Sequence, residues 1–211
     1  MKRREALRHI GLSAGYIAAT PALFSLLQSC ESKYTIDWTP EFLSMEEAKV
    51  TDQLVNLIIP ETDTPGARAL NIPVFIDKYF STVISEEEGQ FFKYGMGVLI
   101  EEVGVSETNP ADKISEKEYD AFLAKHLKIS KEKQIEYGEQ MGEVASPEDL
   151  AAVPREVIVF NMLSAIRGLS VYAYKNTEYV GENVLAYLPV PGSQVGCDSL
   201  ETLTGGKAWS L

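Results

Sequence analysis

The stretch REVIVFNMLSAIRGLSVYAYKN, residues 155–176, constrains the fold of this chain more than any other feature. It is apolar on nearly every side at helical spacing, with Ile158 and Met162 on one face and Val159 on another. A helix that is apolar all round is buried in the middle of a bundle. Pro154 is well placed to open such a helix. We therefore predict an all-α fold in which these residues form the central helix.

Shorter amphipathic segments predict the helices that surround this centre. Apolar residues recur at helical spacing after Ser44, Ser85 and Ser115, each of which suits a helix N-cap. Ser44 and Glu47 have the spacing of a capping box, and Pro60 ends the helix that follows. No strand-like alternation extends over more than a few residues. We expect an irregular bundle of about six helices, with an extended tail rich in Pro and Gly.

The first thirty residues have the pattern of an export signal, with a basic head, an uncharged apolar middle and a small-residue exit. The Arg3-Arg4 pair predicts the twin-arginine route, with the general secretory route as the alternative. The sequence LLQSC, ending at Cys30, resembles a lipobox, in which the cysteine thiol receives a diacylglycerol and becomes the new N-terminus. The alternatives for this apolar run are a transmembrane anchor and a buried core helix.

These patterns divide the chain into an export signal (1–29), a lipidated tether (30–43) and a single helical domain (44–211). From about residue 180 the domain is expected to continue as a tail that wraps over its surface. The location implied is the periplasmic side of the cell envelope, with a lipid anchor in a membrane. The net charge of −12 argues against a nucleic-acid partner, because phosphates would be repelled.

The chain has few residues that could hold a cofactor or a metal. After Cys30, Cys197 is the only cysteine, and His126 is the only histidine after the signal. Cysteine pairs for haem or iron–sulfur clusters are missing, as are the glycine-rich fingerprints for dinucleotides and phosphates. We therefore predict no catalytic, cofactor-binding or metal-binding residue in this chain.

Several single residues have more than one interpretation. Arg167, the only charge in the middle of the central helix, is expected to be buried in an ion pair with Asp63 or Asp77; a partner-binding or anion-binding role is the alternative. His126 falls on an apolar stripe and is expected to be a packed, hydrogen-bonded core residue. Cys197 is expected to be a buried packing residue, with an intermolecular disulfide as the alternative.

The tail carries a strip of aromatic, apolar and proline residues with two equally supported interpretations. It could dock a partner protein, because proline-restricted extended chain loses little entropy on binding, or it could pack on its own bundle. The candidate docking residues are Tyr187, Leu188, Pro189, Pro191 and Trp209.

Two stretches carry a family resemblance. The segment LVNLIIPETDTPGARALNIPVFID, residues 54–77, resembles the signature of the gluconate 2-dehydrogenase subunit 3 family. The tail segments YLPVPGSQVGC and GGKAWSL are similar to the ends of members that also carry a twin-arginine lipoprotein signal.

The resemblance implies a small, cofactor-free subunit of a membrane-associated sugar or polyol dehydrogenase. Its partner would be a flavoprotein of the glucose–methanol–choline type that holds FAD, with a c-type cytochrome as an optional third member. The small subunit would aid export, stability and tethering of the flavoprotein. Two alternatives stay open: a free-standing envelope lipoprotein that binds a small ligand or another envelope protein, and an enzyme that uses Asp63 or Asp77.

Overall fold

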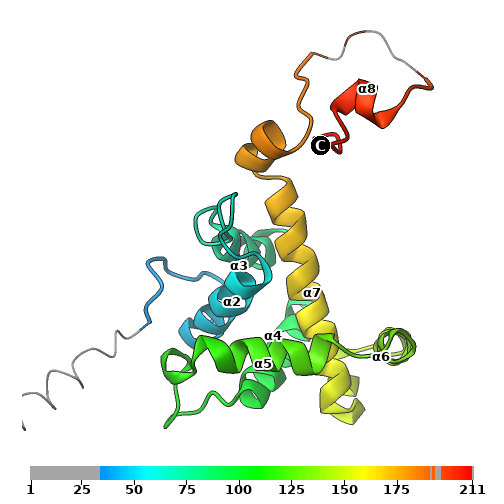
Figure 1. Cartoon of the computed structure of the whole chain (residues 1–211). Coiled ribbons are helices and arrows are strands. Elements are labelled where there is room, and N and C mark those ends of the chain that lie inside the picture. Colours follow the sequence, from blue (N-terminus) through cyan, green and yellow to red (C-terminus); the bar gives the residue numbers. More distant parts are fainter. Residues whose placement is uncertain (1–33, 191, 193–195, 211) are drawn as a thin grey trace, which may run out of the picture. The chain divides into compact units, whose positions relative to one another are not determined.

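The computed structural model describes residues 34–190, 192 and 196–210, and these fold into helices joined by turns (Figure 1). Within this part of the chain no extended strand occurs, and the all-α prediction is confirmed. The predicted signal residues Arg3 and Arg4 and the lipidation residue Cys30 lie outside the described residues. The α-helices are α2 (Met45–Ile58), α3 (Ile72–Thr82), α4 (Glu86–Val103), α5 (Glu116–Leu127), α6 (Lys131–Gly142), α7 (Arg155–Lys175) and α8 (Leu200–Thr204). Short 3₁₀ turns η1 (Ala111–Lys113) and η2 (Pro147–Ala152) and a π-helical turn η3 (Val180–Val184) complete the fold.

Serine caps set the beginnings of the outer helices as the sequence predicts. The Ser44 hydroxyl accepts a hydrogen bond from the Glu47 N–H, and the Glu47 carboxylate accepts one from the Ser44 N–H. The same reciprocal pair occurs at Ser85 and at Ser115. Each box satisfies backbone donors that have no partner inside the helix, so the local sequence fixes where α2, α4 and α5 begin.

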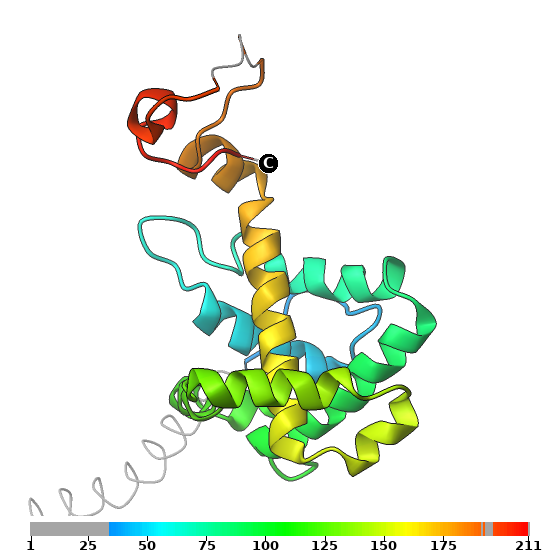
Figure 2. The same ribbon diagram turned by 90° about the vertical axis from the view of Figure 1, so that its right-hand side faces the viewer.

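Helix α7 lies at the centre of the bundle, as predicted, and packs against α2, α3, α4, α5 and α6 (Figure 2). Val159, Leu163 and Ile166 are fully buried. By length and composition alone α7 could cross a membrane, but its neighbours bury half of its apolar window, as expected for a core helix. Its C-terminal half projects beyond α4, α5 and α6. Ser170 and Ala173 of this half are buried, whereas Val171 and Tyr172, on the other side of the helix, are exposed.

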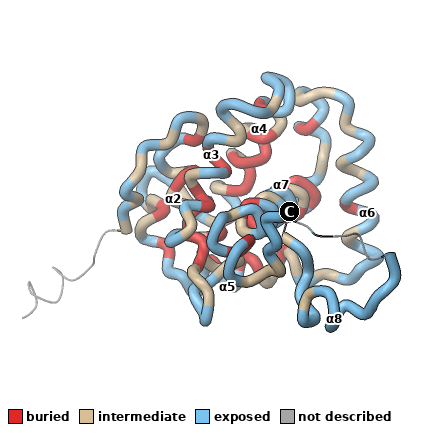
Figure 3. The backbone as a smooth tube through the Cα atoms, turned by 90° about the horizontal axis from the view of Figure 1, so that it is seen from above, coloured by how far each residue is buried: buried red, intermediate tan, exposed pale blue. Residues whose placement is uncertain are grey.

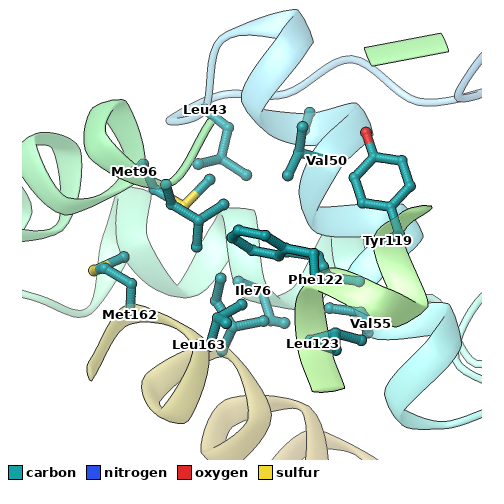
Figure 4. Close-up of a cluster of buried hydrophobic side chains, with 14 of the residues drawn as sticks. Leu43, Val50, Val55, Ile76, Met96, Tyr119, Phe122, Leu123, Met162 and Leu163 are labelled. Carbon is teal, nitrogen blue, oxygen red and sulfur yellow. The ribbon is translucent and has the colours of Figure 1, made fainter. Parts of the chain in front are cut away.

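The core fills the space between α7 and the helices around it, with buried residues inside and exposed ones outside (Figure 3). Side chains from five helices converge there, among them Val55 of α2, Ile76 of α3, Met96 of α4, Leu123 of α5 and Leu163 of α7 (Figure 4). The Tyr119 hydroxyl, buried in the same cluster, donates to the Ala111 carbonyl at 3.2 Å. One continuous core therefore ties α2, α3, α4, α5 and α7 into a single body.

Candidate partner-binding surface

The chain beyond α7 forms a C-terminal arm, which we define as residues 176–190, 192 and 196–210 (Figure 1). The arm closes on itself through Ala186. The Ala186 N–H donates to the Ala208 carbonyl, and the Ser210 N–H donates to the Ala186 carbonyl, both at 2.9 Å. A Cβ added at Gly181 would lie 2.9 Å from the Ser210 Oγ, so the two ends of the arm approach closely, and a larger residue at position 181 would require the Ser210 side chain to shift.

The arm does not cover the bundle. Both ribbon views place α8 and the C-terminal end beyond the end of α7 and away from α4, α5 and α6 (Figures 1 and 2). No residue of α8 is buried. The prediction of a tail wrapped over the domain surface is therefore wrong for the described residues, because the arm finds its backbone partners within itself.

Most of the exposed large hydrophobic side chains lie at this end of the molecule. In the described part of the chain, nine of fourteen such side chains fall between residues 171 and 209. Tyr187 and Trp209 are 49% and 48% exposed, and Val190 is 80% exposed. These exposures favour the docking interpretation over the one in which the strip packs on its own bundle. Such a concentration of exposed apolar surface is typical of a protein-binding site. Leu188 and Pro189 are also exposed, and Pro191 lies outside the described residues.

The apolar surface continues from the arm onto the side of the bundle. Phe75, at the N-terminal end of α3, lies 6.4 Å from Tyr172 and 6.1 Å from Tyr79, measured between ring centroids. Phe75 lies on the outer side of α3 and is 38% exposed. Aromatic side chains in such clusters are frequent anchors of protein–protein interfaces. This cluster was not predicted from the sequence, although Phe75 lies in the segment that carries the resemblance.

The loop of that segment braces the projecting half of α7. The hydroxyls of Thr64 and Tyr174 lie 2.9 Å apart in a hydrogen bond. The loop is narrow, because the Ala67 N–H donates to the Ile59 carbonyl and a Cβ added at Gly66 would lie 2.6 Å from the Glu61 backbone nitrogen. The segment 59–67 therefore positions the end of α7 from which the arm extends.

Asp77 has a structural role that differs from the predicted one. Its carboxylate is 1% exposed and accepts hydrogen bonds from the backbone N–H groups of Glu41, Phe42 and Leu43, at 2.7, 3.1 and 2.8 Å. These three residues belong to the segment that the sequence analysis assigned to the tether. The end of that segment is thus fixed to the helical body, and the Leu43 side chain is part of the core.

Arg167 does not form the predicted buried ion pair. Its side chain is exposed on the projecting half of α7, Asp63 is exposed in the loop, and Asp77 is bound by backbone donors. The arginine of α7 that pairs with a carboxylate is Arg155, whose Nη2 lies 3.0 Å from Glu101. The prediction is wrong because Arg167 lies on the outward face of α7, whereas Ile166 and Ser170 on the inward face are fully buried. A partner-binding or anion-binding role for Arg167 stays a hypothesis.

The ion pair that joins helix to loop is instead formed by Arg68, whose Nε donates to the Asp52 carboxylate at 2.7 Å. Burial raises the pKa of Asp52 above its usual range, and the nearby guanidinium offsets only part of this effect. This pair was not predicted from the sequence, because Asp52 lies on the opposite side of α2 from the apolar stripe and Arg68 follows it by sixteen residues.

His126 is buried in the core, as predicted, with its ring 4.7 Å from that of Phe122. The prediction also expected a hydrogen-bonded ring, but within the described residues its Nε2 has no hydrogen-bond partner. Burial lowers the pKa of His126, the neighbouring Lys125 lowers it further, and the acidic side chains of Glu102 and Glu156 offset only part of the effect. A neutral imidazole is therefore favoured in the folded state.

Cys197 is exposed in the arm, so its interpretation as a buried packing residue is wrong. An intermolecular disulfide at Cys197 stays open as the alternative. In the part of the chain that the structure describes, no cluster of three or more His, Cys, Asp or Glu side chains could hold a metal ion.

The helical body thus ends in an arm with exposed apolar surface, which is typical of a protein that binds a partner. Comparison with protein families identifies the family. The family model described as gluconate 2-dehydrogenase subunit 3 matches residues 45–192, and the chain belongs to that family. The chain is accordingly a subunit of a dehydrogenase complex and associates with its catalytic subunit. Comparisons with curated proteins and with solved structures gave no significant match.

Proposed function

We propose that this chain is the non-catalytic small subunit of an FAD-dependent dehydrogenase of the glucose–methanol–choline type that oxidises a sugar or polyol. In this proposal it accompanies the flavoprotein through export, stabilises it and tethers it to a membrane. The family membership supports the association with a catalytic dehydrogenase subunit. The observation that carries the proposal is the exposed apolar surface from residue 171 to the end of the arm.

The arm and the aromatic cluster around Phe75 and Tyr172 are the proposed docking surface. A stable interface buries about 800 Å² on each partner, and its energy is concentrated in a few aromatic anchors near the centre. Tyr187 and Trp209 have the required size and exposure. Because the closed arm is already ordered by its Ala186 hydrogen bonds, binding costs less conformational entropy than for a free tail. Binding to the folded flavoprotein then stabilises it by mass action.

Tethering depends on the lipid proposed at Cys30 and on the fixed end of the tether. Two or three acyl chains anchor strongly, because each buried CH₂ contributes about 0.8 kcal/mol. The hydrogen bonds from the backbone N–H groups of residues 41–43 to Asp77 hold the end of the tether against the core. The Arg3-Arg4 pair supports the twin-arginine route, which carries folded cargo such as a loaded flavoprotein.

The test is purification of the tagged full chain from membranes of the native host. The proposal predicts a co-purifying large subunit with the absorption spectrum of flavin, with or without a c-type cytochrome. The Cys30→Ala variant should release the complex from membranes, and the double variant Arg3→Lys, Arg4→Lys should abolish export of both subunits.

A chain that elutes alone from membranes would contradict the proposal and support the alternative, a free-standing envelope lipoprotein. Sugar oxidation by the isolated chain would contradict its non-catalytic role.

A further inference from the structure

A pocket of about 360 Å³ lies on the side of the bundle between α4 and α7, on elements that do not include the C-terminal arm. Phe80, Phe91 and Phe92 form one wall, and Met162 and Ala165 of α7 lie opposite. Apolar side chains make up nearly all of the lining. The pocket is thus a separate feature from the docking surface proposed above.

The shape of the pocket depends on a glycine at its floor. An added Cβ at Gly95 would overlap the Met162 sulfur and would lie 2.6 Å from the Met162 Cγ. The Met162 side chain therefore lies directly on the backbone of α4 and leaves the space beside it open. A thioether next to aromatic rings is a favourable and adaptable contact for apolar molecules.

The aromatic wall is held in place from behind. The rings of Phe80 and Phe92 pack with their centroids 3.6 Å apart, and Phe42 packs against both. Phe92 is buried and contacts both Phe42 and Phe80, so its ring is held in the wall by its neighbours. The pocket is consequently pre-formed, as most small-molecule sites are.

Two polar side chains at the pocket limit what can bind. The Asn161 Nδ2 donates to the carbonyls of Tyr137 and Val157, at 3.0 and 2.9 Å, so both amide hydrogens are used and Oδ1 is left as an acceptor. Glu88 is exposed at the rim, on a chain of net charge −12. An anion would be repelled from this site, whereas one hydroxyl donor on an apolar molecule would find a partner.

We propose that this pocket binds an uncharged, mainly apolar ring compound that donates one hydrogen bond to Asn161 Oδ1. A single benzene ring fits in a cavity of about 150 Å³, so a volume of about 360 Å³ has room for two fused or linked rings. The volume is within the range of small-molecule sites. This proposal does not depend on the identity of the catalytic subunit.

The probe for the test is 2-naphthol, which has two fused rings, one hydroxyl donor and no charge at neutral pH. Isothermal titration calorimetry is performed on the full chain in non-ionic detergent. Ala165→Phe fills the pocket from an exposed position of α7, and Ala121→Phe places the same ring at an exposed position of α5, away from the pocket. Both variants replace alanine by phenylalanine in a helix, so the helix-propensity cost is the same for the two. The background heat from probe that enters detergent micelles is also the same.

The expected result is saturable binding near one equivalent for the unmodified chain and for Ala121→Phe, and affinity at least about tenfold weaker for Ala165→Phe. The methyl ether of 2-naphthol, which lacks the donor, should bind about fivefold more weakly to the unmodified chain. If circular dichroism shows that Ala165→Phe is unfolded, Ala165→Leu is compared with Ala121→Leu. Absence of saturable heat with the unmodified chain, or equal affinity in a folded Ala165 variant, would overturn the proposal.

Discussion

Removal of the Asp77 carboxylate should detach the end of the tether segment from the helical body. The carboxylate accepts three backbone N–H bonds, and hydrogen bonds to charged groups contribute about 1.5–3 kcal/mol each. In Asp77→Ala, water can bond to the partly exposed N–H groups of Glu41 and Phe42 in place of the carboxylate. The N–H of Leu43 is buried and would be left without a partner. We therefore expect Asp77→Ala to lower the free energy of unfolding by about 3–5 kcal/mol.

Asp77→Asn should cost less, because the three bonds are divided unequally between the two oxygens. Oδ1 accepts from Phe42 and Leu43, and Oδ2 accepts from Glu41. An asparagine that keeps its oxygen at the Oδ1 position retains two of the three bonds and points its amino group at the Glu41 N–H. The expected loss is about 1–2 kcal/mol.

The assay is urea unfolding of the full chain followed by circular dichroism. Asp120, exposed on α5, supplies the matched controls Asp120→Ala and Asp120→Asn, which should change the free energy of unfolding by less than about 0.5 kcal/mol. Limited proteolysis should cut Asp77→Ala near residues 41–43 faster than the unmodified chain. The reasoning would be refuted if Asp77→Ala were as stable as Asp120→Ala, or if Asp77→Ala and Asp77→Asn lost equal free energy of unfolding.

Two further predictions concern stability. Because the pKa of His126 is lowered in the folded state, the unfolded chain takes up a proton first as pH falls below about 6.5. The stability that the neutral imidazole contributes is present above that pH and is lost as pH falls through the lowered folded pKa. Unfolding titrations between pH 7.5 and 5.5 should show the free energy of unfolding falling with pH in the unmodified chain, and His126→Gln should lack this contribution. Gly66→Ala should destabilise the chain by about 1–3 kcal/mol, because the added Cβ meets the Glu61 backbone. Gly97 lies in α4 with open space around it, so Gly97→Ala should stabilise the chain by up to about 1 kcal/mol. Thermal unfolding of the two variants measures the difference.

The sequence predicted those parts of the fold that depend on local chemistry. The caps at Ser44, Ser85 and Ser115 begin helices because hydroxyl and carboxylate groups three residues apart satisfy backbone donors wherever the rest of the chain goes. The central position of α7 followed from its apolar surface, since no other packing would remove that surface from water.

The errors came from contacts between residues far apart in the sequence. Helical periodicity showed that α7 is buried but not which face of it lacks neighbours, and so Arg167 was placed in the core. Asp77 was predicted as a candidate partner of Arg167, but its partners are backbone groups more than thirty residues away. The arm closes through Ala186 and Trp209, a pairing that composition cannot reveal.

The candidate site was predicted in part for the same reason. The exposed strip at Tyr187 and Trp209 could be singled out because proline and aromatic residues occur together there. The cluster around Phe75 and Tyr172 needed the structure, because α3 and α7 bring these rings together from opposite ends of the domain. The pocket likewise depends on the facing positions of Gly95 and Met162 on two helices.

The central claim is that the chain binds its catalytic partner through the C-terminal arm. The most direct measurement is co-purification from native membranes of the triple variant Tyr187→Ala, Leu188→Ala, Trp209→Ala, with the flavin absorbance of the eluate as readout. Its control is the triple variant Val83→Ala, Tyr94→Ala, Ile135→Ala, which removes exposed apolar or aromatic side chains elsewhere in the described chain. The account predicts normal flavin in the control eluate and at least about tenfold less with the arm variant, because interface anchors contribute about 2 kcal/mol or more each. Equal flavin in both eluates, or none with the unmodified chain, would contradict it.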